Sequence, residues 1–430
     1  MTEQTPFQSE KEQKKEQRKK GTRAWPYVVG GILIVALVSI AVVGLGRRLW
    51  PGTNTVKVVV ALPADPVEGE GFVWSVIHAI QLALEEADYQ AGDLTVELVV
   101  KNTADAEGTI VDVNDEAAAQ EAAQDPQVVA FLGSFSSESS KLSIPVLNRA
   151  GVTQLSPSAS YPGLTKSGFA AGEPAVYYPT GQRTFFRLAT PDDMQGAAAA
   201  FWAKDLGLER IYIITGENAY SQGLNRSFQR AAQDVGLTIV NIRIITAEEV
   251  EADDETWEEI ASGIAANVTD QQPDLVYFAG SAYSSLIRAI REAGGETISF
   301  MGTDALYSQG PIDDLGPLAE GLMATFISLT PDDLGTAGEE FSRRFQERFG
   351  YEPGPFAALG YDGMGIVLAA IEQAGQADRA TVLEAMRQVQ YDGLAGHWSF
   401  DENGDTNLMF ISGVRVENGE WQSIGLLRAR

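Results

Sequence analysis

Two Ser-rich turns in the stretch from Phe131 to Thr165 hold the side chains best suited to binding chemistry. Each turn follows a short apolar run that predicts a buried strand, and a helix is predicted between the two turns. In open α/β sheets ligands bind at the carboxyl ends of strands, and the unpaired N–H groups of a helix N-terminus favour anions. Hydroxyls and backbone amides, with no charge before Glu138, suit a small carboxylate. The turns contribute the candidates Ser136, Ser137, Ser158 and Ser160. An alternative is that these serines only cap helices, which serine often does.

A second group of candidates follows predicted strands later in the chain: Tyr220, Ser281 and Asp304. A cleft with hydroxyls and amides on one wall and a carboxylate on the other would complement a zwitterion. The α-carboxylate would bind at Ser137, Ser158 and Ser160, and the α-ammonium at Asp304. The same Asp304 could equally be the N-cap of a helix.

Alternating strand and helix patterns place these residues in an α/β fold. From Val56 onward, apolar runs alternate with segments of helical periodicity, which indicates a parallel, doubly wound sheet. The loop Tyr161–Gln182 separates this series from a second, similar one, so two Rossmann-like lobes are expected. Three later helices without strands between them should cover one of these sheets, and the C-terminus should form a β-meander or hairpin. A chain that leaves one lobe and returns implies a multi-strand hinge and closure around a ligand.

The predicted division of the chain has five parts. It comprises a disordered basic tail (1–24), a membrane anchor (25–50), a linker (51–55), lobe 1 (56–185 and 330–391) and lobe 2 (186–329 and 392–430).

The anchor is predicted from Tyr27 to Gly46, where 20 residues carry no charge. That length matches the hydrocarbon thickness of a bilayer. Trp25, Tyr27 and Trp50 flank it as interfacial aromatic residues, and the preceding basic residues predict a cytoplasmic N-terminus. A buried helix of a soluble protein and a cleaved signal peptide are the alternatives; the length and the lack of a clear A-x-A site favour an uncleaved helix.

Composition excludes several classes of site. The chain has no cysteine, which excludes disulfides, zinc–thiolate sites and iron–sulfur clusters, and its two histidines are far apart in sequence. No metal or cofactor is therefore predicted. The net charge of −28 divides into +5 over residues 1–50 and −33 over the remainder. A body this acidic should not bind nucleic acid. The chain has no G-x-S-x-G motif, which argues against an enzyme.

An ordered series of motifs carries a family resemblance: LGSFSSESS, GVTQLSPSASYPGLT, FFRLATPDD, ERIYIITGENAYSQGL, DLVYFAG and FMGTDALY. From Val56 to the C-terminus the chain resembles the type I periplasmic solute-binding proteins, in the branch that binds leucine, isoleucine, valine or amides for ABC importers. The resemblance implies that Ser137, Ser158 and Ser160 bind the carboxylate of the ligand. It also implies that Tyr220 closes over the ligand, that Asp304 binds the ammonium, and that Trp74 lines the side-chain pocket.

The chain departs from that family at several points. Asp304 stands where the family usually has Glu, and near Ser281 its amino-acid binders often place a tyrosine. The disulfide often seen in the first lobe is missing, and a transmembrane helix is expected in place of a cleaved signal or lipid anchor. These departures affect the identity of the ligand more than the fold.

The function predicted from the sequence is an extracytoplasmic receptor, tethered to the membrane, that delivers a small amino acid or amide to an ABC permease. One alternative is a sensor that signals through a separate protein, since the cytoplasmic tail is too short for a kinase or cyclase. Another is an enzyme acting on the same ligand, such as an amidase, for which the chain offers no nucleophile motif.

Overall fold

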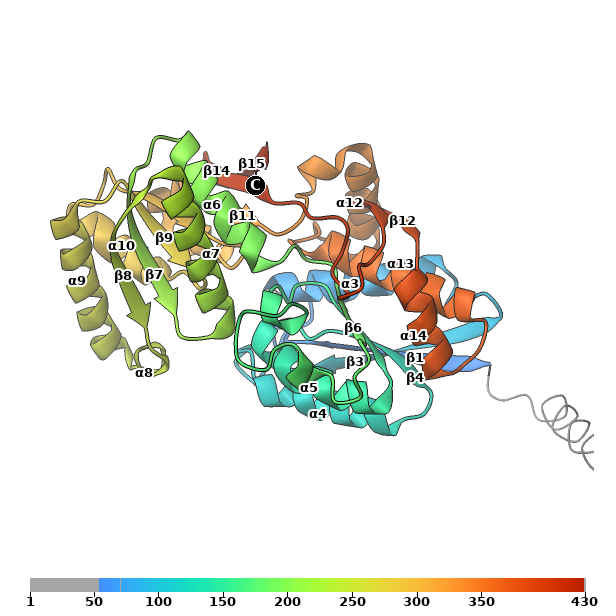
Figure 1. Ribbon diagram of the computed structural model, residues 1–430. Coiled ribbons are helices and arrows are strands. Elements are labelled where there is room, and N and C mark those ends of the chain that lie inside the picture. The colour runs from blue at the N-terminus through green and yellow to red at the C-terminus, as the bar shows by residue number, and fades with distance from the viewer. Residues whose placement is uncertain (1–53, 70, 429–430) are drawn as a thin grey trace, which may run out of the picture. The chain divides into compact units, whose positions relative to one another are not determined.

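Strand β1 (Thr55–Leu62) lies inside a six-stranded sheet, as expected for a run that is apolar except near its start. The computed structural model describes residues 54–69 and 71–428 (Figure 1). The strand order is β2-β3-β1-β4-β5-β6, and every neighbouring pair except β2–β3 is parallel. The other strands are β2 (Gln90–Ala91), β3 (Leu94–Asn102), β4 (Val128–Leu132), β5 (Thr153–Ser156) and β6 (Phe185–Arg187). This parallel order confirms the predicted α/β class.

Helices cover both faces of this first sheet, because successive residues of a strand point to opposite faces. Val58 and Val60 of β1 share a core with helices on one face, and Val59 and Ala61 share a core with helices on the other. The first face carries α3 (Gly71–Glu86), α13 (Ala357–Ala374) and α14 (Arg379–Gln388), and the second carries α4 (Asp112–Gln124) and α5 (Ser137–Ala150) (Figure 1). Two of the three late helices, α13 and α14, thus cover an existing sheet, as predicted, whereas the third, α12 (Gly335–Phe349), packs on α3. We call this sheet and its helices the first lobe.

The second lobe is built around a seven-stranded sheet with the order β15-β14-β11-β10-β9-β7-β8. Its strands are β7 (Arg210–Gly216), β8 (Thr238–Ile245), β9 (Leu275–Ala279), β10 (Ser299–Gly302), β11 (Met323–Phe326), β14 (Ser412–Glu417) and β15 (Glu420–Leu426). One face packs on α6 (Asp192–Asp205) and α7 (Ala219–Val235), the other on α9 (Asp254–Gln271) and α10 (Ser284–Glu292). The predicted C-terminal hairpin is β14–β15, which extends this sheet antiparallel to β11.

The remaining elements complete the fold. They are α8 (Ala247–Val250), α11 (Gly310–Leu315), α12 (Gly335–Phe349), β12 (Tyr391–Gly393), β13 (Gly396–Trp398) and four 3₁₀ turns at 162–164, 175–177, 316–319 and 332–334. The β12–β13 hairpin lies against α13 of the first lobe, where Trp398 Nε1 donates to Asp362 Oδ2 at 2.8 Å. The domain boundaries given above stay a prediction.

Three segments of chain pass between the lobes, after β6, after β11 and before β14. Thr190 in the first segment forms hydrogen bonds to both of the other segments. Its backbone N–H donates to Ile327 O at 3.0 Å, and its hydroxyl donates to Phe410 O at 2.7 Å. The three passages confirm the two-lobe arrangement expected from the sequence, with a connection that has more than one strand.

The predicted tail and membrane anchor lie outside the described residues. Among residues 54–69 and 71–428, no helix is both long and apolar enough to cross a membrane. The span predicted at 27–46 therefore stays a prediction.

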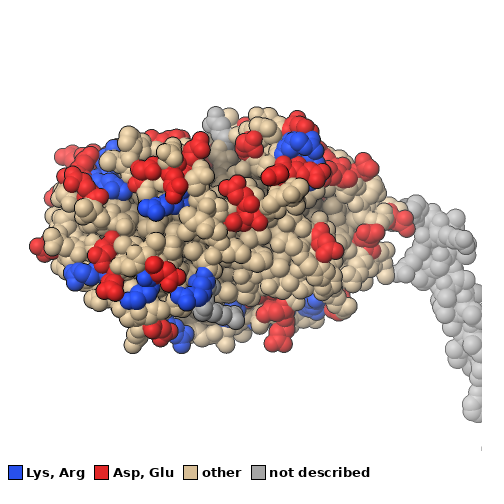
Figure 2. All heavy atoms as spheres, turned by 90° about the horizontal axis from the view of Figure 1, so that it is seen from above, with Lys and Arg blue, Asp and Glu red and all other residues tan. Residues whose placement is uncertain are grey.

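Acidic and basic side chains are interspersed on the face of the molecule shown in Figure 2, without a continuous basic area among the described residues of that face. The large excess of acidic residues beyond residue 50 gives this part of the chain its negative charge. Such a surface repels polyanions. The prediction that the chain does not bind nucleic acid is not tested further by the structure.

Candidate functional site

The first Ser-rich turn, residues 133–137, connects β4 to α5, and two of its three serines, Ser136 and Ser137, have different partners. Ser136 is the N-cap of α5: its Oγ accepts a hydrogen bond from Ser139 N at 2.9 Å and lies 3.1 Å from Asp112 Oδ1. Ser137 Oγ accepts a hydrogen bond from Tyr161 N at 3.1 Å. No described residue accepts a hydrogen bond from the Ser137 hydroxyl, so its proton is available to a ligand.

Helix α5, which was predicted between the two turns, begins at Ser137, the last residue of the first turn. The reason is the cap: Ser136 in extended conformation satisfies an N–H of the first turn, which allows the helix to start directly after it. The N-terminus of α5 therefore lies at the strand end, where its free N–H groups favour an anion.

The second Ser-rich turn, residues 156–160, follows β5 and is hydrogen-bonded to the first. Ser158 Oγ donates to Phe135 O at 2.7 Å, and Ser156 Oγ donates to Ser134 O at 2.7 Å. The carbonyl oxygen of Ser160 accepts a hydrogen bond from Asp192 N at 3.0 Å. Because the hydroxyl proton of Ser158 is already donated to a carbonyl, that hydroxyl can offer a ligand only its lone pairs.

Asp304 is the carboxylate of the second lobe, and it follows β10 as predicted. Its Oδ1 accepts a hydrogen bond from Gln195 Nε2 at 2.7 Å and lies 2.9 Å from the hydroxyl oxygen of Tyr220. The alternative role as a helix N-cap is wrong, since no helix starts there and α11 begins at Gly310. Burial raises the pKa of Asp304, while the hydrogen bonds from Gln195 and Tyr220 lower it.

A buried carboxyl group lies close to this site. Asp192, the first residue of α6, is fully buried, and neither of its carboxyl oxygens accepts a hydrogen bond from a described residue. Burial raises the pKa of Asp192 well above its usual value, and the negative charge of Asp304 raises it further.

These groups meet in one cavity of about 290 Å³ between the lobes. It is lined by Phe72, Ile110, Phe135, Ser136, Ser137, Glu138, Ser158, Ser160, Asn218, Tyr220, Ser281, Asp304, Ala305 and Phe356. Seven of the eight candidates from the sequence are in this lining. The described lining residues include no lysine, arginine or histidine, so the two charged side chains on the wall, Glu138 and Asp304, are both acidic. The cavity can therefore accept a cationic group at Asp304 and an anionic group at the N-terminus of α5.

Trp74 is the candidate that the structure places elsewhere. Its indole Nε1–H donates to Asp65 O at 2.8 Å and its ring lies 5.6 Å from the ring of His78, so it does not line the cavity. The first turn of α3 instead presents Phe72, two residues earlier. On a helix with 3.6 residues per turn these two positions point about 200° apart, and packing against His78 decides which of them faces the cleft.

Three phenylalanine rings form the apolar end of the cavity, and the sequence reasoning missed all three. The ring centroids of Phe72 and Phe135 are 5.6 Å apart, and Phe356 meets Phe135 edge-on at 5.5 Å. Phe135 belongs to the first Ser-rich turn, so its position in SFSSE was the one available signal. Phe72 and Phe356 come from distant parts of the chain, which no local pattern connects.

Two polar residues of the site were also missed. Glu138 lines the cavity and its Oε1 accepts a hydrogen bond from Ala219 N of the other lobe at 2.6 Å. Gln195, which orients Asp304, is fully buried in the first turn of α6 and also donates to Thr325 O at 3.1 Å. The sequence offers little indication of this contact, because Gln195 and Asp304 are 109 residues apart in the chain.

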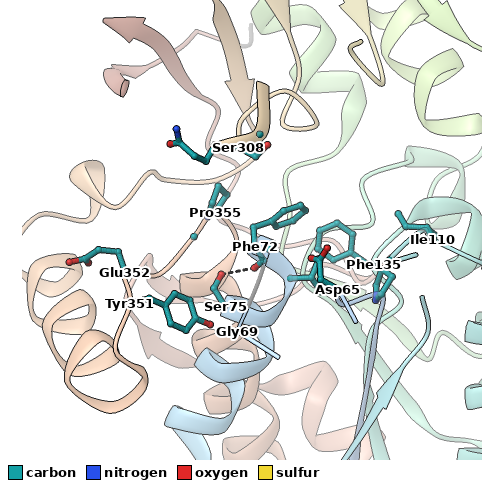
Figure 3. Close-up of a pocket in the computed structure, with 17 residues that line it drawn as sticks. Asp65, Gly69, Phe72, Ser75, Ile110, Phe135, Ser308, Tyr351, Glu352 and Pro355 are labelled. Atoms are coloured by element: carbon teal, nitrogen blue, oxygen red, sulfur yellow. Dashed lines mark hydrogen bonds between the residues drawn. The ribbon is translucent and has the colours of Figure 1, made fainter. Parts of the chain in front are cut away.

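A second, larger cavity of about 640 Å³ adjoins the first (Figure 3). Phe72, Ile110 and Phe135 line both cavities. Beyond them the second cavity is bounded by Asp65, Ser75, Tyr351, Glu352 and Pro355 of the first lobe and by Ser308 of the second lobe (Figure 3).

Comparison with known proteins places this geometry in a family. A family model described as periplasmic binding protein matches residues 71–420. The leucine-, isoleucine-, valine-, threonine- and alanine-binding protein of Pseudomonas aeruginosa is 24% identical over 279 residues, which is 64% of this chain and 68% of that protein.

Solved structures have the same fold. The leucine-binding protein LivK of Thermotoga maritima is 26% identical with a TM-score of 0.70, covering 87% of this chain and 99% of that one. A solute-binding protein of an ABC transporter from R. palustris, solved with benzoate, has a TM-score of 0.70 at 17% identity, covering 87% and 98% of the two chains. The chain belongs to the periplasmic binding protein family, which confirms the resemblance that its motifs indicated.

Proposed function

We propose that this chain is the extracytoplasmic substrate-binding protein of an ABC importer and that its ligand is the zwitterion of an amino acid. One observation carries this proposal: Asp304 is held in a cavity whose described lining has no basic side chain, opposite the N-terminus of α5. An ammonium group would pair with Asp304, and a carboxylate would accept hydrogen bonds from the free hydroxyl of Ser137 and the N–H groups at the start of α5.

The names of the similar proteins support an amino acid or a related small carboxylate. One relative is named for binding leucine, isoleucine, valine, threonine and alanine, and one similar structure contains benzoate. The charges of this cavity favour the first class. A ligand with a carboxylate and no ammonium would leave Asp304 without a cation and place a third negative charge beside Asp304 and Glu138, which is unfavourable at low dielectric.

Ligand capture by lobe closure is part of the same proposal. A ligand that contacts both Ser137 of the first lobe and Asp304 of the second favours the state in which the two lobes are close together. A permease would then recognise the closed form. The similar proteins are named as binding proteins, and we assign no catalytic role to this chain.

Attachment to the membrane through residues 27–46 belongs to the proposal as well. The composition of that stretch supports a single span with the N-terminus in the cytoplasm and the ligand-binding lobes outside. The chain should then remain in the membrane fraction after washing at alkaline pH. Protease added to cells that are enclosed by the cytoplasmic membrane alone should digest the two lobes. Release of the whole chain by the wash would contradict this attachment.

The ligand class is tested by calorimetry on the full-length chain with the common amino acids, their amides and benzoate. We expect at least one amino acid to bind with a Kd in the micromolar range, about −8 kcal/mol. Benzoate should not bind measurably. Binding of benzoate without binding of any amino acid would overturn the proposal.

A further inference from the structure

The apolar end of the ligand cavity is built from aromatic rings at the distances that such rings prefer. The centroid of Phe72 lies 5.6 Å from that of Phe135 and 6.5 Å from that of Phe356, and Phe135 meets Phe356 edge-on at 5.5 Å. Aromatic pairs prefer tilted and edge-to-face arrangements at 4.5–7 Å. The three rings can therefore receive a further ring in the same kind of packing.

The position of Phe356 is maintained against backbone strain. Its φ of 65° lies in the left-handed region, which a bulky side chain rarely adopts. The residue is nevertheless buried and packs edge-on against Phe326 as well as Phe135. Surrounding contacts thus fix its ring at the wall of the cavity.

The apolar end is not closed. Phe72, Ile110 and Phe135 line both this cavity and the larger one drawn in Figure 3, so the two spaces adjoin at these residues. Trp74, which was predicted to line the cavity, would separate the two spaces if its ring lay at this point. Its indole instead donates a hydrogen bond to Asp65 O and lies beside His78. A short aliphatic side chain would end at the rings and leave the second cavity filled with water. A larger side chain would bury more apolar surface there, and burial is favourable in proportion to its area.

We propose that the ligand of this cleft is an α-amino acid with an aromatic side chain, whose ring packs among Phe72, Phe135 and Phe356 and reaches into the second cavity. This rests on the proposed function, since the amino-acid end must be held by Ser137 and Asp304. The second cavity is lined by the carboxylates Asp65 and Glu352 and by no lysine, arginine or histidine among the described residues, so an anionic side chain is disfavoured there.

Calorimetry on the full-length chain with L-phenylalanine, L-tyrosine, L-tryptophan, L-leucine and L-valine tests this ligand class. At least one aromatic amino acid should bind about tenfold or more tightly than valine and leucine, as expected when a pocket fits the larger side chain. Tighter binding of valine or leucine than of all three aromatic amino acids would overturn the inference.

A variant that fills the second cavity supplies the structural test. Ser308 bounds that cavity from the second lobe, and its carbonyl oxygen accepts the Trp421 indole N–H at 2.7 Å, a bond that a side-chain change leaves intact. Ser308→Trp should weaken the aromatic ligands about tenfold and change the affinity for valine by less than about twofold. Ser308→Ala is the matched control and should leave both ligand groups unchanged.

The outcomes separate the two proposals. If valine and leucine bind, lose affinity in Asp304→Asn, and are preferred to aromatic ligands, the proposed function stands and the aromatic class is wrong. If Ser308→Trp weakens valine and the aromatic ligands equally, the second cavity does not receive the side chain and the inference is also wrong. If no amino acid binds at all, both proposals fail.

Discussion

Glu138 of the first lobe accepts a hydrogen bond through Oε1 from the backbone N–H of Ala219 in the second lobe, at 2.6 Å. Ala219 is the first residue of α7, so the carboxylate lies at the positive end of a helix dipole. The same side chain forms an ion pair with Lys141 at 3.1 Å within its own helix. The contact joins the two lobes at the edge of the ligand cavity, and it is available only when the lobes are close together.

Removing this contact should weaken ligand binding, because the closed arrangement of the lobes loses one hydrogen bond. We expect Glu138→Ala to reduce the affinity for the amino acid selected by the screen about two- to fivefold, since a carboxylate at a helix N-terminus contributes roughly 0.3–1 kcal/mol. Calorimetry gives the affinity, and small-angle scattering should show a larger radius of gyration for the ligand-free variant. Glu121→Gln, which changes an exposed pair with Lys101 in the first lobe, is the control. Equal affinity and equal radius for Glu138→Ala and wild type would contradict a role in closure.

Replacing Ser136 and replacing Ser137 by alanine should affect ligand affinity differently. Ser136→Ala removes the cap of α5 and should lower the free energy of unfolding by about 1 kcal/mol, with ligand affinity little changed. Ser137→Ala removes the free hydroxyl proton and should weaken binding about three- to tenfold. It also removes the acceptor of the buried Tyr161 N–H, so it should lower the free energy of unfolding by about 1–3 kcal/mol. Denaturant unfolding and calorimetry on both variants test this division. A loss of affinity in Ser136→Ala larger than in Ser137→Ala would reverse the assignment.

Tyr220 should act through Asp304. In Tyr220→Phe the hydroxyl that lies 2.9 Å from Asp304 Oδ1 is lost while the ring remains. Affinity for an amino acid should fall about three- to tenfold, the effect of one hydrogen bond in a binding site. Tyr212→Phe removes a comparable hydroxyl, bonded to Asn267 in the same lobe but outside the cavity, and should leave affinity unchanged. An equal effect of both changes would point to general destabilisation of the lobe.

Asp115 predicts a specific dependence of stability on pH. It is fully buried in α4, and burial raises its pKa from 3.8 to about 6, although the hydroxyls of Ser134, Thr103 and Ser139 lower it. The folded state therefore holds this proton more tightly than the unfolded state, and stability falls as pH rises from about 4 to about 6. The loss levels off above pH 6 and amounts to about 3 kcal/mol, the order of magnitude for a shift of this size.

Urea unfolding of wild type and Asp115→Asn at several pH values measures the pH-dependent contribution of Asp115 to stability. The free energy of unfolding of wild type, minus that of Asp115→Asn, should decrease between pH 4 and pH 6. Asp125→Asn serves as the opposite case: the hydrogen bond from Lys57 holds the pKa of Asp125 below its usual value, so its contribution is present above that value and lost as pH falls through the lowered pKa. A difference between wild type and Asp115→Asn that is constant with pH would show that Asp115 does not titrate in this range.

The fold was largely predictable because its signals are local. Strand β1 is apolar on both faces, which requires helices on both faces, and that arrangement is found. Strand ends could be located for the same reason, so serines and an aspartate that directly follow strands were correctly expected to meet in one cleft.

The rest of the site depends on contacts between distant segments. Phe72 rather than Trp74 faces the cleft because the indole finds Asp65 O and His78, a choice that the pattern of α3 does not encode. Gln195 orients Asp304 from another helix, and Phe356 reaches the cavity from a strained backbone position more than 200 residues from Phe135. The different roles of Ser136 and Ser137 follow from the residue at which α5 starts, and sequence patterns locate helix ends poorly.

The most direct test of the account is the affinity of Asp304→Asn for an amino acid and for the same molecule without its ammonium group. The substitution keeps the shape of the side chain and removes its charge. Calorimetry with L-leucine, or with the tightest aromatic amino acid, should show a loss of affinity of about 100-fold or more, because a buried ammonium would be left unpaired. The matching carboxylic acid without the ammonium should bind the variant no more weakly than it binds wild type. Unchanged affinity for the amino acid in Asp304→Asn would contradict the assigned polarity of the cleft.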